Sequence, residues 1–258
     1  MHPHPACDGL MRAHFDAMGT VVSVELPAAA DSAALGTAAL GTVRSVFEQW
    51  EARFSLYRPD SELSRIADGT AALAASSAEL RAAYVDALHW RQLTDGAFTP
   101  HRPDGVIDLN GIVKSLAIRA AASALRAAGV RDFCLNAGGD VEVSGTQHAQ
   151  PWSIGIVDPA ARSQLLCSVT LTGARRAVAT SGTAERGDHI WRTGTAEFVQ
   201  VTVIADDMVE ADVLATAIVS GGHAFLADAL QRWSVDVLTV TSTGSLTATP
   251  GFRAALAA

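Results

Sequence analysis

The sequence has few cysteines, few charges and no long unbroken apolar run. Three cysteines in 258 residues are too few for a disulfide framework, and no C-x-x-C pair indicates a zinc or redox site. The chain is 49% hydrophobic and only 18% charged, which excludes extended disorder, a collagen-like repeat and a charged coiled coil. No segment reaches about 18 consecutive apolar residues, so we expect no transmembrane segment.

Positive charge is scarce as well. Lysine and arginine total 19 against 27 aspartates and glutamates, a net charge of −8, so we expect no nucleic-acid partner. Lys114 is the only lysine. In a chain so biased toward arginine, this retained lysine suggests a need for a compact ammonium, for example against a phosphate. The alternative is chance survival on a solvated face.

The amino terminus gives an expectation for location and boundaries. Its first residues, MHPHPACDGL, lack the cationic region and the apolar run of a secretory signal, and no apolar stretch precedes Cys7 as it would in a lipoprotein anchor. We therefore expect a cytoplasmic protein. We expect residues 1–14 to be a disordered tail and residues 15–258 to form a single domain, because no linker rich in Pro, Gly or Ser divides the chain.

Hydrophobic periodicity changes along the chain. Helical spacing is found in five segments: Asp31–Arg53, Ala78–Leu93, Gly111–Ala128, Met208–Ser220 and His223–Gln231. Strand patterns are found in eight: Thr20–Leu26, Phe133–Asn136, Val141–Ser144, Trp152–Val157, Cys167–Leu171, Ala177–Thr180, Val201–Ala205 and Val235–Thr241. Because strands come in runs rather than in regular βαβ units, the pattern predicts an α+β fold with mostly antiparallel sheets and packed helices.

The most informative motif is a carboxylate and a hydroxyl one helical turn apart. Asp212 and Thr216 are i and i+4, and their neighbours are apolar, so the pair would be partly buried on one face. Hard oxygen ligands of this kind suit Mg²⁺, which typically adds substrate phosphates to complete its shell. In the alternative, Thr216 bonds back to a helix carbonyl and Asp212 lies near a helix start that favours negative charge.

Two turns offer backbone groups to a ligand. Asp108–Ser115, DLNGIVKS, enters a helix whose free N–H groups favour anions. Leu135–Gly145, LNAGGDVEVSG, reads as a tight hairpin in which the glycines can also permit close approach of a ligand.

Three further side chains have an open assignment. Ser181 follows a strand and would present its hydroxyl to a ligand from a turn, and His189 would be a base at neutral pH or a structural histidine. Tyr57 would either stack on a planar ring or close the core, and from the sequence alone the core is favoured.

Taken in order, these stretches resemble the ApbE family, the FAD:protein FMN transferases. The resemblance covers roughly residues 15–250 and rests on the following segments: Met18-Gly19-Thr20, Phe54-Ser-x-Tyr57, Ser61-Glu62-Leu63-Ser64, Asp95-Gly96-Ala97-Phe98, Asp108-Leu-x-Gly-Ile-x-Lys114, Asn136-Ala-Gly-Gly-Asp140, Ala179-Thr-Ser-Gly182, His189-Ile190 and Asp212-x-x-x-Thr216. It implies an ApbE-like, T-fold-related architecture.

The resemblance also implies an activity and a set of site residues. An enzyme of this family takes FAD as substrate, holds its pyrophosphate through Mg²⁺, and moves FMN onto a threonine or serine hydroxyl of an acceptor protein with release of AMP. The implied metal ligands are Gly111 (through its carbonyl), Asp212 and Thr216, and the implied catalytic residues are His189 and Asp212. The implied FAD contacts are Met18, Tyr57, Ala97, Phe98, Asp108, Lys114 and Ile190.

The sequence departs from the family pattern at several points. Thr99 stands where an aspartate is usual, Asn110 and Ser115 replace glycines, and Trp191-Arg192 follows His189-Ile190 where the family has Asp-Pro. Two alternatives to transfer therefore stay open: an FAD pyrophosphatase, in which water replaces the acceptor hydroxyl and FMN and AMP are released, and a flavin-binding relative without turnover.

Overall fold

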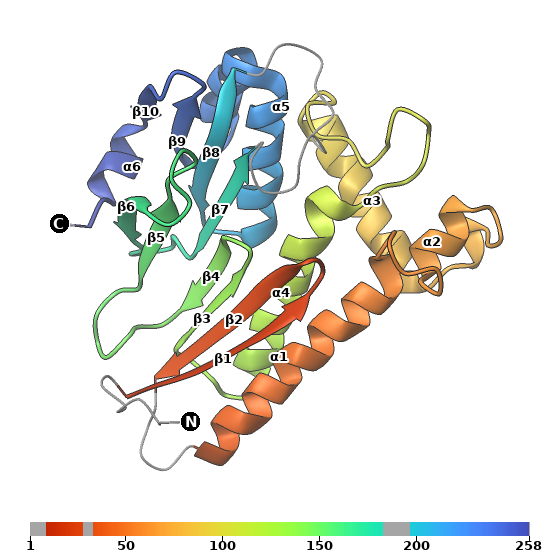
Figure 1. Ribbon diagram of the computed structural model, residues 1–258, viewed down its shortest axis with the longest axis horizontal. Coiled ribbons are helices and arrows are strands. Elements are labelled where there is room, and N and C mark those ends of the chain that lie inside the picture. The colour runs from red at the N-terminus through yellow and green to blue at the C-terminus, as the bar shows by residue number, and fades with distance from the viewer. Residues whose placement is uncertain (1–8, 28–32, 183–196, 258) are drawn as a thin grey trace.

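The computed structural model describes residues 9–27, 33–182 and 197–257 (Figure 1). Eight strands form one sheet in the order β1-β2-β3-β4-β7-β8-β9-β10, and β5 and β6 form a separate two-stranded sheet. All the pairings between these strands are antiparallel. Helices pack against the sheets, and the predicted α+β class is confirmed.

The elements have the following bounds. The strands are β1 (Leu10–Ala17), β2 (Thr20–Pro27), β3 (Phe133–Ala137), β4 (Asp140–Ser144), β5 (Ser153–Val157), β6 (Leu165–Thr170), β7 (Ala177–Gly182), β8 (Phe198–Ala205), β9 (Asp236–Thr241) and β10 (Leu246–Ala248). The helices are α1 (Ala33–Phe54), α2 (Glu62–Ala67), α3 (Ala78–Leu93), α4 (Asn110–Ala127), α5 (Met208–Arg232) and α6 (Pro250–Ala254), with a 3₁₀ turn at Leu73–Ala75.

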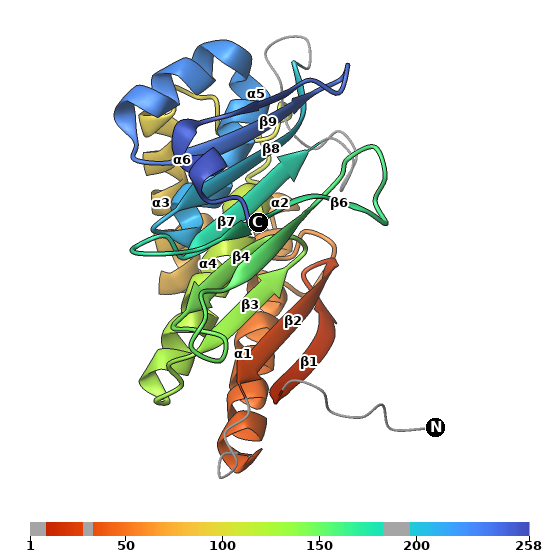
Figure 2. The ribbon, with the colours of Figure 1, turned by 90° about the vertical axis from the view of Figure 1, so that its left-hand side faces the viewer.

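The main sheet separates two hydrophobic cores. Figures 1 and 2 show α1, α4 and α5 on one face of the sheet, where Phe47, Leu116 and Leu214 belong to the larger core. The β5–β6 pair and α6 cover part of the other face, where Trp152 and Phe252 are fully or almost fully buried. Strands β7, β8 and β9 therefore have apolar side chains on both faces, whereas β4 has Val141 and Val143 on one face and Asp140 and Glu142 on the other.

The observed start of β1 corrects one predicted boundary. Leu10–Ala17 pairs along its whole length with Thr20–Pro27, so the chain is ordered from before residue 15 and the predicted tail at 1–14 is wrong for residues 10–14. Its sequence alternates apolar and polar residues from Met11 to Ala17, and Phe15 and Ala17 are buried, so a local strand signal was present here.

Helix α5 is interrupted where the sequence predicts the end of a helix. Gly222 has φ of 63°, a conformation that residues with a side chain rarely adopt. A Cβ at this position would lie 2.2 Å from a carboxylate oxygen of Glu197. The same carboxylate accepts the N–H of His223 at 2.5 Å, which satisfies a donor at the start of the second half. By length and composition alone α5 could cross a membrane, but it packs on β7 and β8 as a core helix.

Candidate active site

A cavity of about 550 Å³ opens where the β1–β2 turn, the end of α1, the start of α4, β7 and α5 meet. Its volume lies in the usual range for small-molecule sites, about 300–1,000 Å³. All the predicted site residues within the described part of the chain line it: Met18, Tyr57, Ala97, Phe98, Asp108, Gly111, Lys114, Asp212 and Thr216. His189 and Ile190 lie outside the described residues.

The β1–β2 turn brings Met18 to the cavity. Met18 and Gly19 have φ of 52° and 70°, and they join the paired residues Ala17 and Thr20 as a two-residue hairpin. A methionine in the left-handed region is unusual, because its Cβ approaches the following carbonyl. Such local strain is typical of ligand-binding positions.

The chain leaves α1 beside the cavity and exposes an aromatic ring there. Phe54 fills the core at the last position of the helix, so Tyr57 is not needed in the core. Tyr57 is 78% exposed at the edge of the cavity, and the favoured core assignment is wrong. The segment is held by Ser55, whose carbonyl accepts the hydroxyl of Ser61 at 2.6 Å and that of Ser64 at 3.0 Å.

Gly111 permits a close contact that shapes the floor of the cavity. A Cβ at this position would lie 2.9 Å from Cε2 of Phe98, so the backbone of α4 and the buried phenyl ring approach more closely than another residue would allow. Asp108 lies just before the helix and accepts the N–H of Asn110 at 2.9 Å. Gly111 lines the cavity, but the predicted row of free N–H groups is not found at this helix start, because the N–H groups of Ile112 and Val113 both donate to the Leu109 carbonyl.

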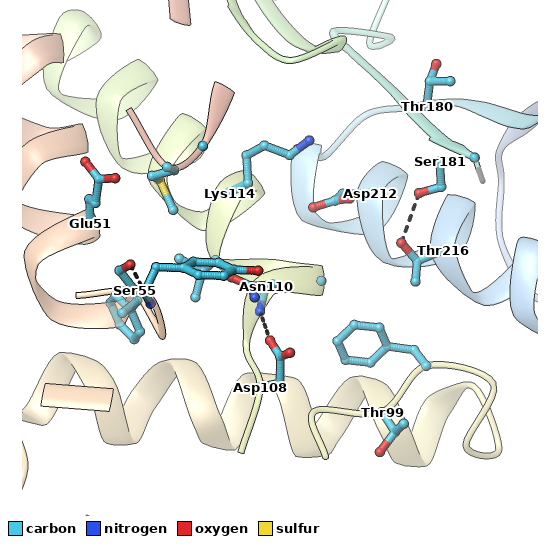
Figure 3. Close-up of a pocket in the computed structure, with 18 of the residues that line it drawn as sticks. Glu51, Ser55, Thr99, Asp108, Asn110, Lys114, Thr180, Ser181, Asp212 and Thr216 are labelled. Atoms are coloured by element: carbon cyan, nitrogen blue, oxygen red, sulfur yellow. Dashed lines mark hydrogen bonds between the residues drawn. The ribbon is translucent and has the colours of Figure 1, made fainter. Parts of the chain in front are cut away.

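Lys114 is held inside the site and does not lie on a solvated face. Its side chain is 11% exposed and forms an ion pair with Asp140. This excludes the alternative of chance survival at the surface. In Figure 3 the Lys114 amine points toward the side of the cavity where Asp212 and Thr180 lie.

Asp212 and Thr216 project from α5 into the same cavity (Figure 3). The Thr216 hydroxyl lies 3.0 Å from the hydroxyl of Ser181, so it interacts with β7 and the alternative of a bond back to its own helix is not the contact observed. Asp207, not Asp212, caps α5, because its carboxylate accepts the N–H of Val209 and of Glu210. Asp212 is 6% exposed.

Several lining residues were not identified from the sequence as site residues. Glu51, Arg58 and Thr180 are such residues. Ser181, which the sequence did indicate, also lines the cavity, but from within β7 instead of from a turn. Glu51 precedes Phe54 by three positions on α1, so both lie near one face of the helix, and this helical spacing could have identified Glu51. Thr180 belongs to the family segment Ala179-Thr-Ser-Gly182, but its place at the cavity depends on strand pairing.

The oxygen donors implied as metal ligands, two on α5 and one on α4, fit a hard cation. Asp212, Thr216 and the Gly111 carbonyl supply oxygen only, and a carbonyl oxygen has a second lone pair beyond its helical hydrogen bond. Among the described residues no group of three or more His, Cys, Asp or Glu gathers as a metal site. One carboxylate with neutral oxygens, completed by ligand phosphates, is the set that Mg²⁺ accepts and that Zn²⁺ does not favour.

Comparisons with known proteins agree with the resemblance seen in the motifs. The sequence model of the ApbE family matches residues 18–102 and 99–239. A curated protein named FAD:protein FMN transferase, from Rhodobacter capsulatus, is 36% identical over 165 residues, which are 59% of this chain and 31% of that protein. The chain thus matches about a third of the length of this relative.

Solved structures share the fold over nearly the whole chain. The ApbE protein of Thermotoga maritima has a TM-score of 0.82 at 20% identity and covers 96% of this chain and 100% of its own. The flavinyl transferase ApbE of Pseudomonas stutzeri has a TM-score of 0.77 at 21% identity, covering 97% and 98% respectively. The flavin transferase ApbE of Vibrio cholerae has a TM-score of 0.75 at 24% identity, covering 96% and 100%.

Proposed function

The chain belongs to the ApbE family, and from this premise we propose that it transfers FMN from FAD to a threonine or serine hydroxyl of an acceptor protein, with release of AMP. The observation that carries the proposal is the meeting of Lys114, Asp212 and Thr216, from two helices far apart in the sequence, in one cavity. An ammonium beside hard oxygen ligands suits a pyrophosphate, and the relative from Rhodobacter capsulatus carries the name of this activity.

The reaction needs positioning more than it needs reactive side chains. The acceptor oxygen attacks the phosphorus of the FMN half, the bond from that phosphorus to the bridging oxygen breaks, and AMP leaves with the bridging oxygen. The attacking hydroxyl loses its proton, for which His189 or a cavity carboxylate is the candidate acceptor. Holding the hydroxyl in line with the leaving group supplies much of the rate advantage.

Different residues of the cavity suit different parts of the substrate. Tyr57 and Met18 suit a flat ring at the open edge, and the ammonium of Lys114 suits the phosphates. Asp212, Thr216 and the Gly111 carbonyl would hold Mg²⁺, which neutralises charge that develops on phosphate oxygens. Lys114 adds a fixed positive charge at the same place, where it stabilises the transition state electrostatically.

One assay tests the proposal against its alternatives. Purified protein is incubated with FAD, Mg²⁺ and a peptide that contains threonine and serine, and AMP and the peptide mass are followed. We expect AMP together with a peptide heavier by FMN. AMP with free FMN would favour the pyrophosphatase, and bound FAD with neither product would favour a relative without turnover.

A pair of variants on α5 tests the metal ligands. Asp212→Asn should lower AMP release by about a hundredfold or more, because a carboxylate ligand becomes a neutral amide. Glu210→Gln is the matched control, since it makes the same chemical change on the same helix but does not line the cavity. If both variants released AMP at the wild-type rate, the assignment of Asp212 would be wrong.

A further inference from the structure

A lysine on a helix does not by itself have a defined position. Its four-carbon stem is flexible, and ordering it costs side-chain entropy that some contact must offset. Lys114 projects from the second turn of α4 and is nearly buried, and its Nζ forms an ion pair with Oδ2 of Asp140, the first residue of β4. The position of the ammonium is therefore determined by the carboxylate as well as by the helix.

Asp140 holds a second group at the same time. Its side chain is only 1% exposed, and its Oδ1 accepts the backbone N–H of Thr180 in β7 at 3.1 Å. The ladder between β4 and β7 pairs Val141 with Val178 and Glu142 with Ala177, so this side-chain bond continues the contact beyond the ladder. One carboxylate thus joins α4, β4 and β7.

Asp140 holds two residues that line the cavity but does not line it itself. Lys114 and Thr180 are lining residues. The residue after Thr180 is Ser181, whose hydroxyl is 3.0 Å from that of Thr216 on α5. The contacts therefore run from the ammonium, through Asp140 and β7, to the side of the cavity that carries the proposed metal ligands.

We propose that Asp140 is a positioning residue for FMN transfer, which fixes the Lys114 ammonium and the β7 backbone relative to each other. This inference rests on the proposed function. The Lys114 ammonium has three N–H donors, and the ion pair with Asp140 uses one of them. Asp140, which lies outside the cavity lining, thereby directs the other two donors toward the phosphates of FAD. Without Asp140 the lysine keeps its charge but loses its defined direction.

The chain offers a matched control on the same strand. Glu142 lies two residues beyond Asp140, so both side chains project from the same face of β4. Glu142 is also buried, at 4% exposed, and forms an ion pair with Arg126 of the same helix α4 at 2.7 Å, but neither residue lines the cavity. Glu142→Gln therefore removes an equivalent buried charge without touching the site.

The test compares Asp140→Asn, Lys114→Met, the double variant and Glu142→Gln, with kcat and KM for AMP release as readouts. Asparagine keeps an oxygen for the Thr180 N–H and removes the charge. We expect Asp140→Asn to lower kcat about tenfold or more, with the KM for the acceptor peptide changed by less than about twofold. In the Lys114→Met background, the same substitution should change kcat by less than about twofold, because the residues act as one unit.

Two results would overturn the inference: Asp140→Asn matching Glu142→Gln in kcat, or the effects of Asp140→Asn and Lys114→Met multiplying in the double variant. Circular dichroism establishes folding. If Asp140→Asn does not fold, the double variant is used instead, because it leaves neither charge of the pair without its partner. Its kcat is compared with that of Lys114→Met, and a change of more than about twofold would overturn the inference.

The failure of the proposed function is a separate outcome. It would appear as wild-type protein that yields neither AMP nor flavinylated peptide. In that case the positioning role is tested by FAD binding, measured by flavin fluorescence without added metal. Asp140→Asn and Lys114→Met should weaken binding by the same factor and Glu142→Gln should not, whereas equal binding by all three variants would overturn the positioning role.

Discussion

The ring of Tyr57 stays exposed at the edge of a cavity whose deeper residues are buried. An aromatic residue that is 78% exposed contributes little to the folded state, so Tyr57→Ala should change the free energy of unfolding by less than about 0.5 kcal/mol. A ring that stacks on a flavin or adenine contributes to binding instead. We expect the dissociation constant for FAD, measured by fluorescence titration, to rise about tenfold, in keeping with about 1–3 kcal/mol for aromatic stacking on a base.

Tyr57→Phe is the control for this residue, because it keeps the ring and removes only the hydroxyl. It should bind FAD within about twofold of wild type, since the stacking surface is unchanged. Equal loss of affinity in Tyr57→Ala and Tyr57→Phe would assign the contact to the hydroxyl and contradict stacking.

At the scale of elements, α5 carries two carboxylates with different environments. Asp212 faces the cavity, and Glu210 lies in the first turn, where burial raises its pKa and the charges of Asp207 and Asp206 raise it further. Because the folded-state pKa is above the unfolded value, the folded protein binds this proton more tightly. The stabilisation from this proton is therefore fully present below about pH 4.3, the ordinary glutamate pKa, and it is lost as the pH rises through the folded-state pKa of Glu210.

Glu210→Gln removes this dependence. Glutamine also suits the third position of a capped helix, so the cap at Asp207 is kept. We expect the variant to be more stable than wild type at pH 7, by about 0.5 kcal/mol, and equal to it at pH 4, in urea unfolding at both pH values. A gain of the same size at pH 4 would show that the effect is not the charge.

Elements that begin and end on local signals were predictable. Helix α3 has the predicted bounds, and its start is set by Ser77, whose hydroxyl accepts the N–H of Leu80. The break at Gly222 was predicted for the same reason, since a glycine pair is a local signal. β10 was not predicted, because it is a three-residue edge strand with largely exposed residues that depends on pairing with β9. β1 was not predicted either, although Met11–Ala17 alternates apolar and polar residues and so carries a local strand signal.

At the scale of the whole molecule, the site could be predicted only in part. Asp212 and Thr216 lie one helical turn apart, so their shared face follows from the sequence. Lys114, Asp140 and Thr180 come from three elements, and their meeting is a result of sheet order, in which β4 lies beside β7. No local pattern encodes that contact, and the family motifs identified Lys114 and Asp140 without indicating that they form a pair.

Two cysteines, Cys134 and Cys167, can be used to follow how the sheets open during unfolding. Cys134 lies in β3, between β2 and β4, where burial raises the pKa of its thiol to about 12, with the nearby charge of Glu25 adding to the effect. Cys167 lies in β6 of the two-stranded sheet, where burial also raises the thiol pKa. The thiolate is the reactive form, so neither thiol should react rapidly with a disulfide reagent at pH 8 while the protein is folded.

The two thiols should become reactive together. Both side chains pack against the second core, which lies on the face of the main sheet that the β5–β6 pair and α6 cover. Detachment of the small sheet therefore exposes Cys134 on β3 as well as Cys167 on β6, and in rising urea both should be labelled, as mapped by peptide mass, before the loss of circular dichroism is complete. Labelling of Cys167 at low urea while Cys134 stays protected until the main sheet unfolds would contradict this expectation.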